Sequence, residues 1–491
     1  MLLVQPPQTQ RGFTRSGTLL PPLGLATLAA SLRLNDVDVK ILDAEGQLSS
    51  WREISAEIAS YRPDVVGITC TSYTVRQAAE VARISKEQSH AITVIGGPHP
   101  SIDPVGLIRD FSEVDVTVQN EGEATIVDLV ACLEGDRGLR LVDGIAFRSG
   151  GEVIVNKPRI QLRNLDDLPL PAWDLLPSRV WKNYWDPRAA RFPIATLQTN
   201  RGCPHQCIYC SEPKVYGPGV RFKSAARVVD EIQYDQEKFG VREVSIVDSV
   251  FTLSPRKVEE ICDEIAARRI DISWACNSRV DKIEPSILRK MKRAGCHRIY
   301  FGVETGSEEE LPLIKKRTTL PQVRRAIRLC KDNAVHCEAG FILGLPGQDM
   351  RQIGRTVEFA RTLNADSTQF SILLPLPGTA VFKMAEQMGI DLPNYWDAGF
   401  NAPRVTLCNL SVQQLLKAQK WAYRSVYFRP EYLLSQLRRI RSIADLRYDV
   451  SRLSRFARYM SRKNSPGKDG EDSVGRAATR VGARLEPLIK V

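Results

Sequence analysis

At 491 residues, of which 43% are hydrophobic and 25% charged, the chain has the composition of an ordinary globular protein and room for two or three domains. Its formal net charge is +11, but much of the basic excess lies near the C-terminus, so the charge does not indicate a nucleic-acid-binding protein. No apolar run approaches the length of a membrane-spanning helix, and the chain starts without a basic lead, so we expect neither a membrane span nor a signal peptide.

From residue 1 to about residue 132, short β-rich runs alternate with amphipathic helical patterns. The expected strands are Leu2–Val4, Val37–Leu42, Val65–Thr69, Thr93–Ile95 and Val114–Val118, and the expected helices between them include Leu23–Leu34, Trp51–Ser60 and Val75–Lys86. This alternation predicts an α/β domain with a parallel sheet covered by helices on both faces, which is a Rossmann-like (flavodoxin-like) arrangement.

Polar and small residues follow several of these strands, at the edge where such sheets bind ligands. They are Asp43 and Glu45 after the second strand, Thr71 and Ser72 after the third, and Gly96, Gly97 and His99 after the fourth. The glycines let the backbone approach a ligand closely, and the hydroxyl groups supply hydrogen bonds. A flavodoxin-like domain that binds some other ligand, or none, is the alternative interpretation of this segment.

The next chemical signal is a C-x3-C-x2-C array, Cys203, Cys207 and Cys210, which directly follows an expected strand at Ala195–Gln198. Three close thiolates leave one iron of a four-iron cluster without a protein ligand, so that iron can bind a substrate or a cofactor. One alternative is a structural zinc site with His205 as fourth ligand, although zinc sites normally use two separated ligand pairs. The other alternative is three unrelated cysteines. The chain has 11 scattered cysteines, an odd number that favours reduced thiols in the cytoplasm over a disulfide framework.

An aromatic residue, Tyr209, precedes the last cysteine of the array. With it, the array resembles the cluster motif of radical S-adenosylmethionine (SAM) enzymes. The resemblance implies that the three cysteines carry a [4Fe-4S] cluster whose open iron is chelated by SAM. It also implies that one electron cleaves SAM to methionine and a 5′-deoxyadenosyl radical, while the protein binds, orients and shields the cofactors.

The first segment resembles the cobalamin-binding domain that precedes the radical core in one branch of this family. Its matching stretches are Pro21–Gly24 and Gly96–His99. Further along the chain, the proline-rich connector Leu162–Pro177 and the P-x-P-G-T turn Pro375–Thr379 resemble the same branch. The residues that the resemblance places at cobalamin are Asp43, Glu45, Thr71, Ser72, Gly96, Gly97 and His99. Many other cobalamin proteins carry D-x-H-x-x-G, whose histidine ligates cobalt. Glu45 stands in the place of that histidine, so we expect cobalt without a histidine ligand.

After the cysteine array, strands and helices continue to alternate up to about residue 397. The expected strands are Glu243–Val247, Trp274–Ser278, Arg298–Val303, Cys337–Leu343 and Thr368–Leu373, and the expected helices are Ala225–Phe239, Pro255–Arg268, Pro285–Ala294 and Leu320–Asn333. About six such units predict a partial (β/α)6 barrel, whose chemistry lies at the carboxyl ends of its strands.

Charged residues or glycine follow four of the barrel strands. The resemblance implies that Asp248 holds the ammonium group of SAM, that Arg279 pairs with its carboxylate and that Glu304 binds its ribose or pairs with Arg279. Gly344 lies in a segment that resembles the G-x-I-x-G-x-x-E motif, which packs on adenine in that family. The polar residue that ends the motif falls one place late in this chain, at Gln348.

The segment after residue 397 is helical in pattern. One helix is expected at Ser411–Phe428, with Ser411 as its N-cap. A second is expected at Pro430–Met460, where arginines interleave with apolar residues. This basic helix either makes a peripheral contact with an anionic membrane or forms a solvated cap over the barrel, and we favour the cap.

These patterns divide the chain into five segments. They are a cobalamin-binding domain at residues 1–140, a linker at 141–190, a radical SAM core at 191–397, a helical C-terminal domain at 398–462 and a flexible tail at 463–491.

The function that the resemblance implies is that of a cobalamin-dependent radical SAM enzyme that methylates an unactivated carbon of a biosynthetic intermediate. Its partners would be a small-molecule substrate and an electron donor such as flavodoxin or ferredoxin, without nucleic acid. A cyclase or rearrangement enzyme with the same cofactors is the first alternative. The second alternative is a non-catalytic cobalamin-binding regulatory protein.

Overall fold

The computed structural model of the protein describes residues 1–7, 18–135, 138–186, 188–392, 403–430 and 432. The tail at 463–491 and nearly all of the expected helix Pro430–Met460, with the membrane contact assigned to it, lie outside these residues. Within the described ranges, no helix is both long and apolar enough to cross a bilayer.

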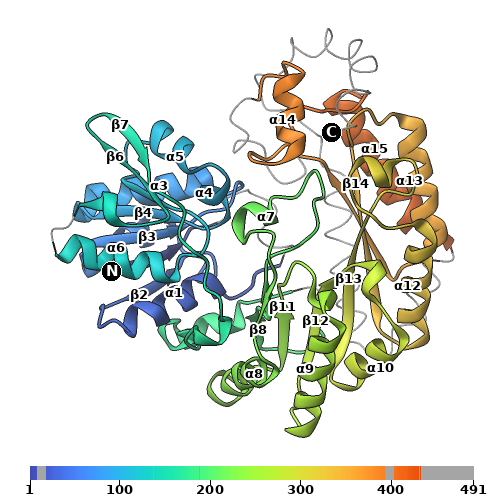
Figure 1. The fold of residues 1–491 in the computed structure, drawn as a ribbon, viewed down its shortest axis with the longest axis horizontal. Coiled ribbons are helices and arrows are strands. Elements are labelled where there is room, and N and C mark those ends of the chain that lie inside the picture. Colours follow the sequence, from blue (N-terminus) through green and yellow to red (C-terminus); the bar gives the residue numbers. More distant parts are fainter. Residues whose placement is uncertain (8–17, 136–137, 187, 393–402, 431, 433–491) are drawn as a thin grey trace. The chain divides into compact units, whose positions relative to one another are not determined.

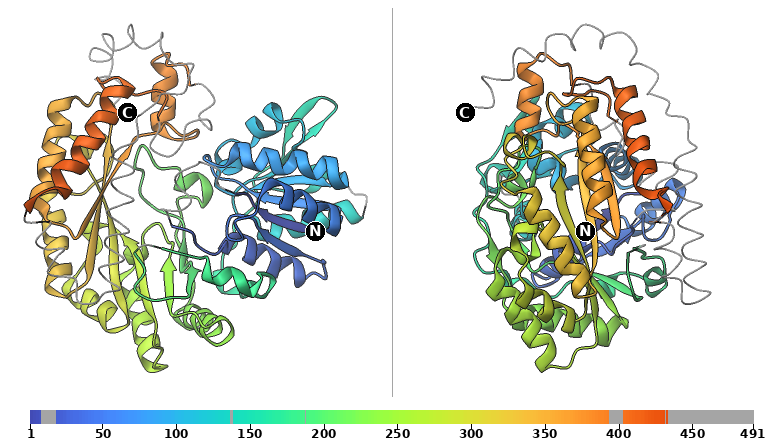
Figure 2. Two further views of the ribbon diagram at one scale, coloured as in Figure 1. Left: turned by 180° about the vertical axis from the view of Figure 1, so that it is seen from behind. Right: turned by 90° about the vertical axis from the view of Figure 1, so that its right-hand side faces the viewer.

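The described chain forms two compact units. Unit 1 contains Met1–Gln206, Cys210–Ser278 and Glu284–Arg298. Unit 2 contains Cys207–Tyr209, Arg279–Ile283 and the described residues from Ile299 onward. Figures 1 and 2 show the ribbon in three views, coloured along the sequence.

A seven-stranded sheet in unit 1 has the order β2-β1-β3-β4-β5-β6-β7. Its strands are β1 (Leu2–Gln5), β2 (Lys40–Asp43), β3 (Val65–Thr69), β4 (Ile92–Gly96), β5 (Val116–Val118), β6 (Ile145–Ser149) and β7 (Glu152–Val155). The first five are parallel, which confirms the predicted Rossmann-like sheet. The hairpin β6–β7, which was not predicted, extends the sheet with antiparallel strands.

Helices cover both faces of this sheet (Figure 1). They are α1 (Leu23–Arg33), α2 (Trp51–Tyr61), α3 (Val75–Ser89), α4 (Pro98–Ile102), α5 (Pro104–Asp110) and α6 (Glu123–Glu134). Helix α1 packs with α6, and α2 packs with α3. Local chemistry sets the start of α2, where Ser50 and Glu53 form a capping box.

Strand β2 begins at Lys40, three residues later than the predicted Val37, because α1 ends in a closed turn. Asp36 adopts a left-handed conformation with φ 58°, and the N–H of Val37 donates to the carbonyl of Leu32. This pattern is a helix stop of the Schellman type. It uses the backbone of Val37 for the turn, so the strand starts only after it.

A second sheet has the strand order β15-β14-β13-β12-β11-β8, the six strands expected of the partial barrel. Its strands are β8 (Ile194–Leu197), β11 (Glu243–Ile246), β12 (Ser273–Ser278), β13 (Cys296–Glu304), β14 (His336–Leu343) and β15 (Ser367–Ile372). The strands pair in parallel within unit 1 (β8 with β11, β11 with β12) and within unit 2 (β14 with β15). The α/β class of the core is therefore confirmed.

The helices of this part follow the predicted alternation. They are α8 (Ala225–Phe239), α9 (Pro255–Ala267), α10 (Pro285–Arg293), α11 (Glu310–Leu313), α12 (Leu320–Asp332), α13 (Met350–Leu363), α14 (Ala380–Gln387) and α15 (Val412–Tyr427). Helices α12 and α13 pack on β14. Proline stands in the first turn of α9, α10 and α12, where its missing N–H costs no hydrogen bond.

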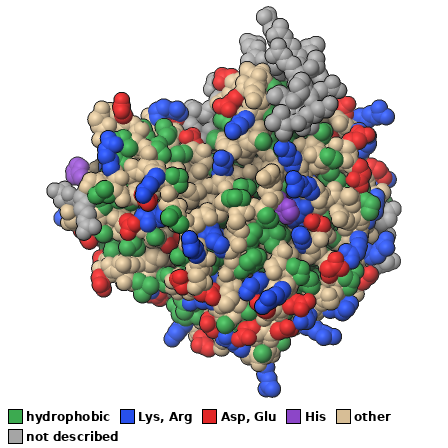
Figure 3. All heavy atoms as spheres, in the orientation of Figure 1, with side chains coloured by type: hydrophobic (Ala, Val, Ile, Leu, Met, Phe, Trp, Pro, Cys, Tyr) green, Lys and Arg blue, Asp and Glu red, His purple; other side chains and the backbone are tan. Residues whose placement is uncertain are grey.

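Helix α15 covers the free edge of β15. The hydroxyl of Tyr427 bonds to both the N–H (2.8 Å) and the carbonyl (2.6 Å) of Thr368, and Gln419 donates to the carbonyl of Phe370 (2.8 Å). These side chains satisfy strand groups that would otherwise form an exposed edge. The predicted N-cap is confirmed, because Ser411 accepts from the N–H of Gln414. Figure 3 shows basic and acidic side chains interspersed over one face of the described molecule.

Candidate active site

The cysteine array lies on a loop closed by a short antiparallel ribbon in unit 1. Strand β9 (Asn200–Arg201) pairs with β10 (Arg221–Phe222), and the loop runs between them. Gly202 opens the loop with φ 94°, and a Cβ there would overlap the carbonyl oxygen of Gly219. Only glycine meets both demands, so the chain can turn sharply into the array.

Cys203 is buried, whereas Cys207 and Cys210 are partly exposed, and none of the 11 cysteines is in a disulfide. Three thiols within eight residues of one loop are the donor set that an iron–sulfur cluster uses, so the residues fit the cluster by their chemistry. Among the described residues, no three His, Cys, Asp or Glu side chains form a group that could hold a metal ion. This holds for Cys203, Cys207 and Cys210 as well as for His205, so both the cluster and the zinc assignment of these residues stay predictions.

The middle of the loop, Cys207–Tyr209, belongs to unit 2. The N–H of Ile208 donates to the carbonyl of Ile314, its own carbonyl accepts from Val381, and its side chain lies in a hydrophobic cluster with both. Ile208 thus holds the backbone on either side of it. This anchoring sets where Cys207 and Tyr209 point.

A polar cluster in unit 2 contains Tyr209 and Glu304. Tyr209 is hydrogen-bonded to Glu304 and to Cys207, and burial together with these neighbours raises the pKa of the Tyr209 hydroxyl well above its usual value. Glu304, at the carboxyl end of β13, has φ 74°, which is strained for a residue other than glycine. Its carboxylate accepts from the buried ammonium of Lys316 at 2.7 Å.

Arg279 reaches the same loop that carries Lys316. It is buried, its Nε donates to Asp281 (2.9 Å), and its Nη2 donates to the carbonyl of Lys316 (2.9 Å). The structure therefore places two acidic and two basic side chains in one region of unit 2, namely Glu304, Asp281, Lys316 and Arg279. Such a set can meet the ammonium and the carboxylate of an amino acid at the same time.

Gly344 follows β14 with φ 85°, and a side chain there would clash with Leu415. Gln348 holds this turn, because its side-chain oxygen accepts from the N–H groups of Gly344 (2.7 Å) and Leu345 (3.3 Å). Its amide donates to Glu310 at 3.0 Å. Burial raises the pKa of Glu310. A glutamine suits this place because a carboxylate would face Glu310 without a donor.

Asp248 is fully buried at the end of β11 and accepts hydrogen bonds from the base of the cysteine loop. Its oxygens bind the N–H (2.7 Å) and the hydroxyl of Thr199, and the N–H (3.2 Å) and side-chain amide (2.8 Å) of Asn200. Burial raises its pKa to about 6, against the effect of these donors. The observed role of Asp248 is to brace β9, and its contact with the SAM ammonium stays a prediction.

At the strand ends of the first sheet, the structure brings Ser72 and His99 together. The His99 ring is fully buried, with Nδ1 3.1 Å from the hydroxyl of Ser72. Burial lowers its pKa to about 4, so the imidazole is neutral at neutral pH. Gly97 lies beside them with φ 104°, where a Cβ would come within 2.9 Å of the Cys70 carbonyl oxygen. Gly96 ends β4 next to them.

The other residues predicted to contact cobalamin are held by the protein itself. Asp43 accepts from the N–H of Gly46 (2.9 Å) and the hydroxyl of Tyr184 (2.8 Å), and burial raises its pKa. Glu45 is buried in the same turn, and the Thr71 hydroxyl lies 3.2 Å from that of Thr74. Their contacts with cobalamin stay predictions.

Sequence reasoning missed Lys316 and Tyr184, and it left Gln348 without a role. No spacing or motif singles out Lys316, which stands among other lysines and arginines. No sequence pattern singles out His297 or Asp366, which both have partners in the structure. His297 pairs with Glu243 at 2.9 Å, and Asp366 accepts from the N–H of Cys337 at 2.8 Å.

The two α/β sheets and the loop with three cysteines define a class of proteins that combine two α/β domains. The family model of the radical SAM superfamily matches residues 197–360, and that of the B12 binding domain matches residues 13–130. The chain is 34% identical over 440 residues to an uncharacterized methyltransferase of Pyrococcus horikoshii, which covers 89% of this chain and 94% of that protein. The chain therefore belongs to the family of cobalamin-binding radical SAM enzymes.

A second relative and two solved structures are also similar to this chain. An anaerobic magnesium-protoporphyrin IX monomethyl ester cyclase of Rubrivivax gelatinosus is 29% identical over 372 residues, covering 74% of this chain and 66% of that protein. The structure of the cobalamin-dependent radical enzyme OxsB, with aqua-cobalamin and SAM bound, superposes with a TM-score of 0.70 at 19% identity, covering 94% of this chain and 70% of that chain. The methyltransferase TsrM from Kitasatospora setae, with cobalamin and cluster bound, gives 0.67 at 20% identity, covering 79% and 78%. The cofactors of this enzyme are a [4Fe-4S] cluster, SAM and cobalamin.

Proposed function

We propose that this enzyme transfers a methyl group from SAM to an unactivated carbon of a small biosynthetic intermediate. The observation that carries the proposal is the 34% identity to the methyltransferase of Pyrococcus horikoshii over nearly the whole length of both chains. A similarity of that extent includes both cofactor domains, not one of them alone.

The residues of the chain would divide the work. When bound, the cofactors supply one-electron cleavage of SAM and a centre for methyl transfer. Cys203, Cys207 and Cys210 would hold the cluster. The residues that would bind SAM are Tyr209, Asp248, Arg279, Glu304, Lys316 and the Gly344 turn. The strand ends from Asp43 to His99 would hold cobalamin.

The charge pattern of unit 2 supports the SAM assignment. Glu304 and Lys316 form a buried pair at 2.7 Å, and Arg279 lies against the backbone of Lys316. Because each charge is already balanced by a neighbour, a zwitterionic ligand can replace protein partners without leaving an unpaired charge. Water is largely excluded from this cluster, so the ligand would be oriented by few, strong contacts.

The test is anaerobic reconstitution with iron, sulfide and hydroxocobalamin, followed by SAM and a strong reductant. We expect 5′-deoxyadenosine from SAM cleavage and S-adenosylhomocysteine from methyl donation. Cys203→Ala should abolish 5′-deoxyadenosine, whereas Cys262→Ala, a matched change of a buried cysteine on α9, should retain it. A fully iron-loaded protein that forms no 5′-deoxyadenosine would refute the radical mechanism.

A second candidate is a cyclase or rearrangement enzyme with the same cofactors. The similarity to the Rubrivivax gelatinosus cyclase, over 74% of this chain, favours it. The same assay separates the two functions. If protein that has bound cobalamin forms 5′-deoxyadenosine without any S-adenosylhomocysteine, the result would favour ring formation or rearrangement over methyl transfer.

We further propose a flavodoxin or ferredoxin as electron donor and a reducing, cytoplasmic setting. The support is that all 11 cysteines are thiols in the structure, outside any disulfide. An iron–sulfur cluster with an open iron also needs a reducing environment. Reduction by purified flavodoxin, followed through 5′-deoxyadenosine formation, tests the donor.

A further inference from the structure

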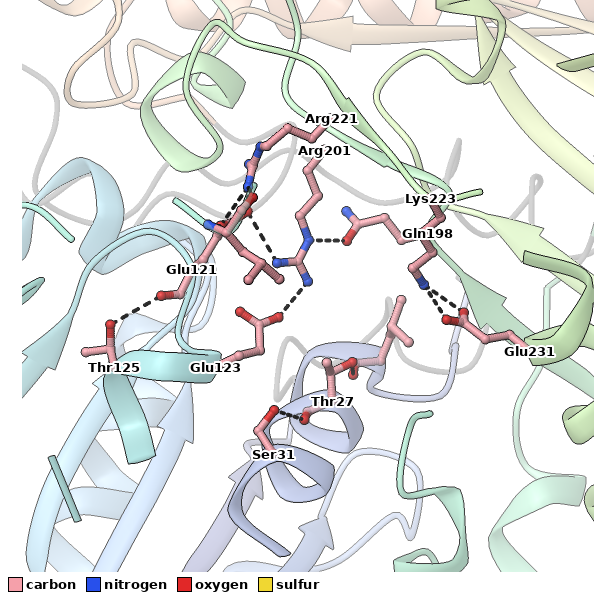
Figure 4. Close-up of polar contacts among 12 residues, drawn as sticks. Thr27, Ser31, Glu121, Glu123, Thr125, Gln198, Arg201, Arg221, Lys223 and Glu231 are labelled. Atoms are coloured by element: carbon pink, nitrogen blue, oxygen red, sulfur yellow. Dashed lines mark hydrogen bonds and ion pairs between the residues drawn. The ribbon is translucent and has the colours of Figure 1, made fainter. Parts of the chain in front are cut away.

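The turn after β5 holds the loop that carries the cysteines. Asn120 donates from its side chain to the carbonyls of Lys214 (2.6 Å) and Val215 (3.1 Å), both in α7 (Glu212–Val215) within the cysteine loop. The next residues of the turn, Glu121 and Glu123, point to the ribbon at the base of the loop (Figure 4). This turn belongs to the predicted cobalamin domain, whereas the loop and ribbon belong to the radical SAM core.

Two arginines of the ribbon donate hydrogen bonds to these carboxylates. Arg221 on β10 binds Glu121 with both terminal nitrogens, at 2.8 and 2.7 Å (Figure 4). Arg201 on β9 donates to Glu123 at 2.6 Å and lies 3.3 Å from Glu121. Its Nε donates to Gln198 at 2.9 Å. We call Glu121, Glu123, Arg201 and Arg221 the clamp.

The clamp is largely buried and is balanced in charge. The exposed fractions of its side chains are 8% for Arg201 and Glu121, 14% for Arg221 and 15% for Glu123. Two acids face two bases, so no charge is left over. Salt screens buried pairs much less than surface pairs, so ionic strength weakens the clamp less than it weakens a surface ion pair. Arg201 uses its planar fork toward three partners, which a lysine cannot do.

Arg201 of the clamp lies next to the cysteine array in the chain, so the clamp can control where the array lies. Arg201 stands two residues before Cys203, and Gly202 between them is fixed by its close approach to Gly219. A shift of Arg201 therefore moves Cys203. Glu121 and Glu123 stand after the carboxyl end of β5, at the edge where parallel sheets of this kind bind ligands.

We propose that the clamp is a positioning device that fixes the cluster loop relative to the cobalamin domain. It sets the distance between the two cofactors, and its residues act through the loop without touching the reacting atoms. The proposal rests on the proposed function, because it requires both cofactors to be bound. It predicts that weakening the clamp changes the geometry between the cofactors before it changes the binding of either.

The experiment measures that geometry directly. Protein reconstituted with the cluster and hydroxocobalamin is reduced to the paramagnetic forms of both, and EPR spectroscopy reads the spin–spin coupling between them. The variants are Glu123→Gln, which removes one charge, and Arg201→Gln, which removes the centre of the clamp. The control is Asp174→Asn, which breaks a two-bonded pair with Arg33 on the surface of the same unit.

We expect the coupling to shift or broaden in Glu123→Gln, and more strongly in Arg201→Gln, with iron and cobalamin contents unchanged. The control should match the unmodified enzyme. If Arg201→Gln does not fold, Glu123→Gln decides alone. Unchanged coupling in a Glu123→Gln protein that holds both cofactors would overturn the clamp while leaving the proposed function intact. An unmodified enzyme that binds no cobalamin would overturn the proposed function, and the clamp with it.

Discussion

The buried pair of Glu304 and Lys316 allows a quantitative prediction. The two charges lie 2.7 Å apart, with side chains that are 11% and 7% exposed. At that distance and an effective dielectric constant of about 20, their attraction is roughly 6 kcal/mol before desolvation is subtracted. Removing one partner of such a pair typically costs about 3–5 kcal/mol, because the other charge stays buried and unpaired. We expect Lys316→Met to lower the free energy of unfolding by about 3 kcal/mol.

The assay is a double-mutant cycle by urea denaturation, with Lys316→Met, Glu304→Gln and the double variant. If the loss comes from an unpaired carboxylate, the second substitution should restore part of the stability lost in the first, which appears as a coupling energy. The matched control is the exposed pair of Arg361 and Glu358 on α13, which should show little coupling. Equal coupling in the buried and the exposed pair would refute the electrostatic reasoning.

Three further predictions concern the frame of the site. Burial raises the pKa of Asp248 to about 6 in the folded protein. The stability that Asp248 contributes is therefore fully present below the ordinary pKa of an aspartate and is lost as the pH rises through 6. Asp248→Asn should remove this pH dependence from the free energy of unfolding measured between about pH 4 and pH 7. Tyr427→Phe should cost about 1–3 kcal/mol and speed hydrogen exchange at the amide of Thr368, since two hydrogen bonds to the edge strand are lost. Gly202→Ala should prevent iron incorporation during reconstitution, whereas Gly219→Ala, where a Cβ meets nothing within 4 Å, should not; equal iron contents would contradict the steric argument.

Local patterns predicted most elements to within a few residues. Strand β3 lies at Val65–Thr69 as predicted, and the helix start at Ser411 follows from a capping box that the sequence displays. Such signals are local, because periodicity and caps depend on neighbours three or four residues away. The hairpin β6–β7 was missed because its strands are short and lie in a stretch assigned to the linker.

The sequence by itself determined the class of this protein. Three cysteines in one short loop resemble the cluster motif of the family, and the two runs of alternating strands and helices predict the α/β frame, both without any long-range contact. Thiolate ligands must be close in space, and a loop keeps close in space what is close in sequence. The same is true of the glycines at strand ends, since backbone conformation is a local property.

The partners of buried charges were decided only by the tertiary structure. Lys316 meets Glu304 across 12 residues, and Arg221 meets Glu121 across 100. No periodicity links such positions, because packing of distant elements alone determines which charges are buried together. Burial then decides how much each pair matters, since a charge removed from water must find its counter-charge in the protein.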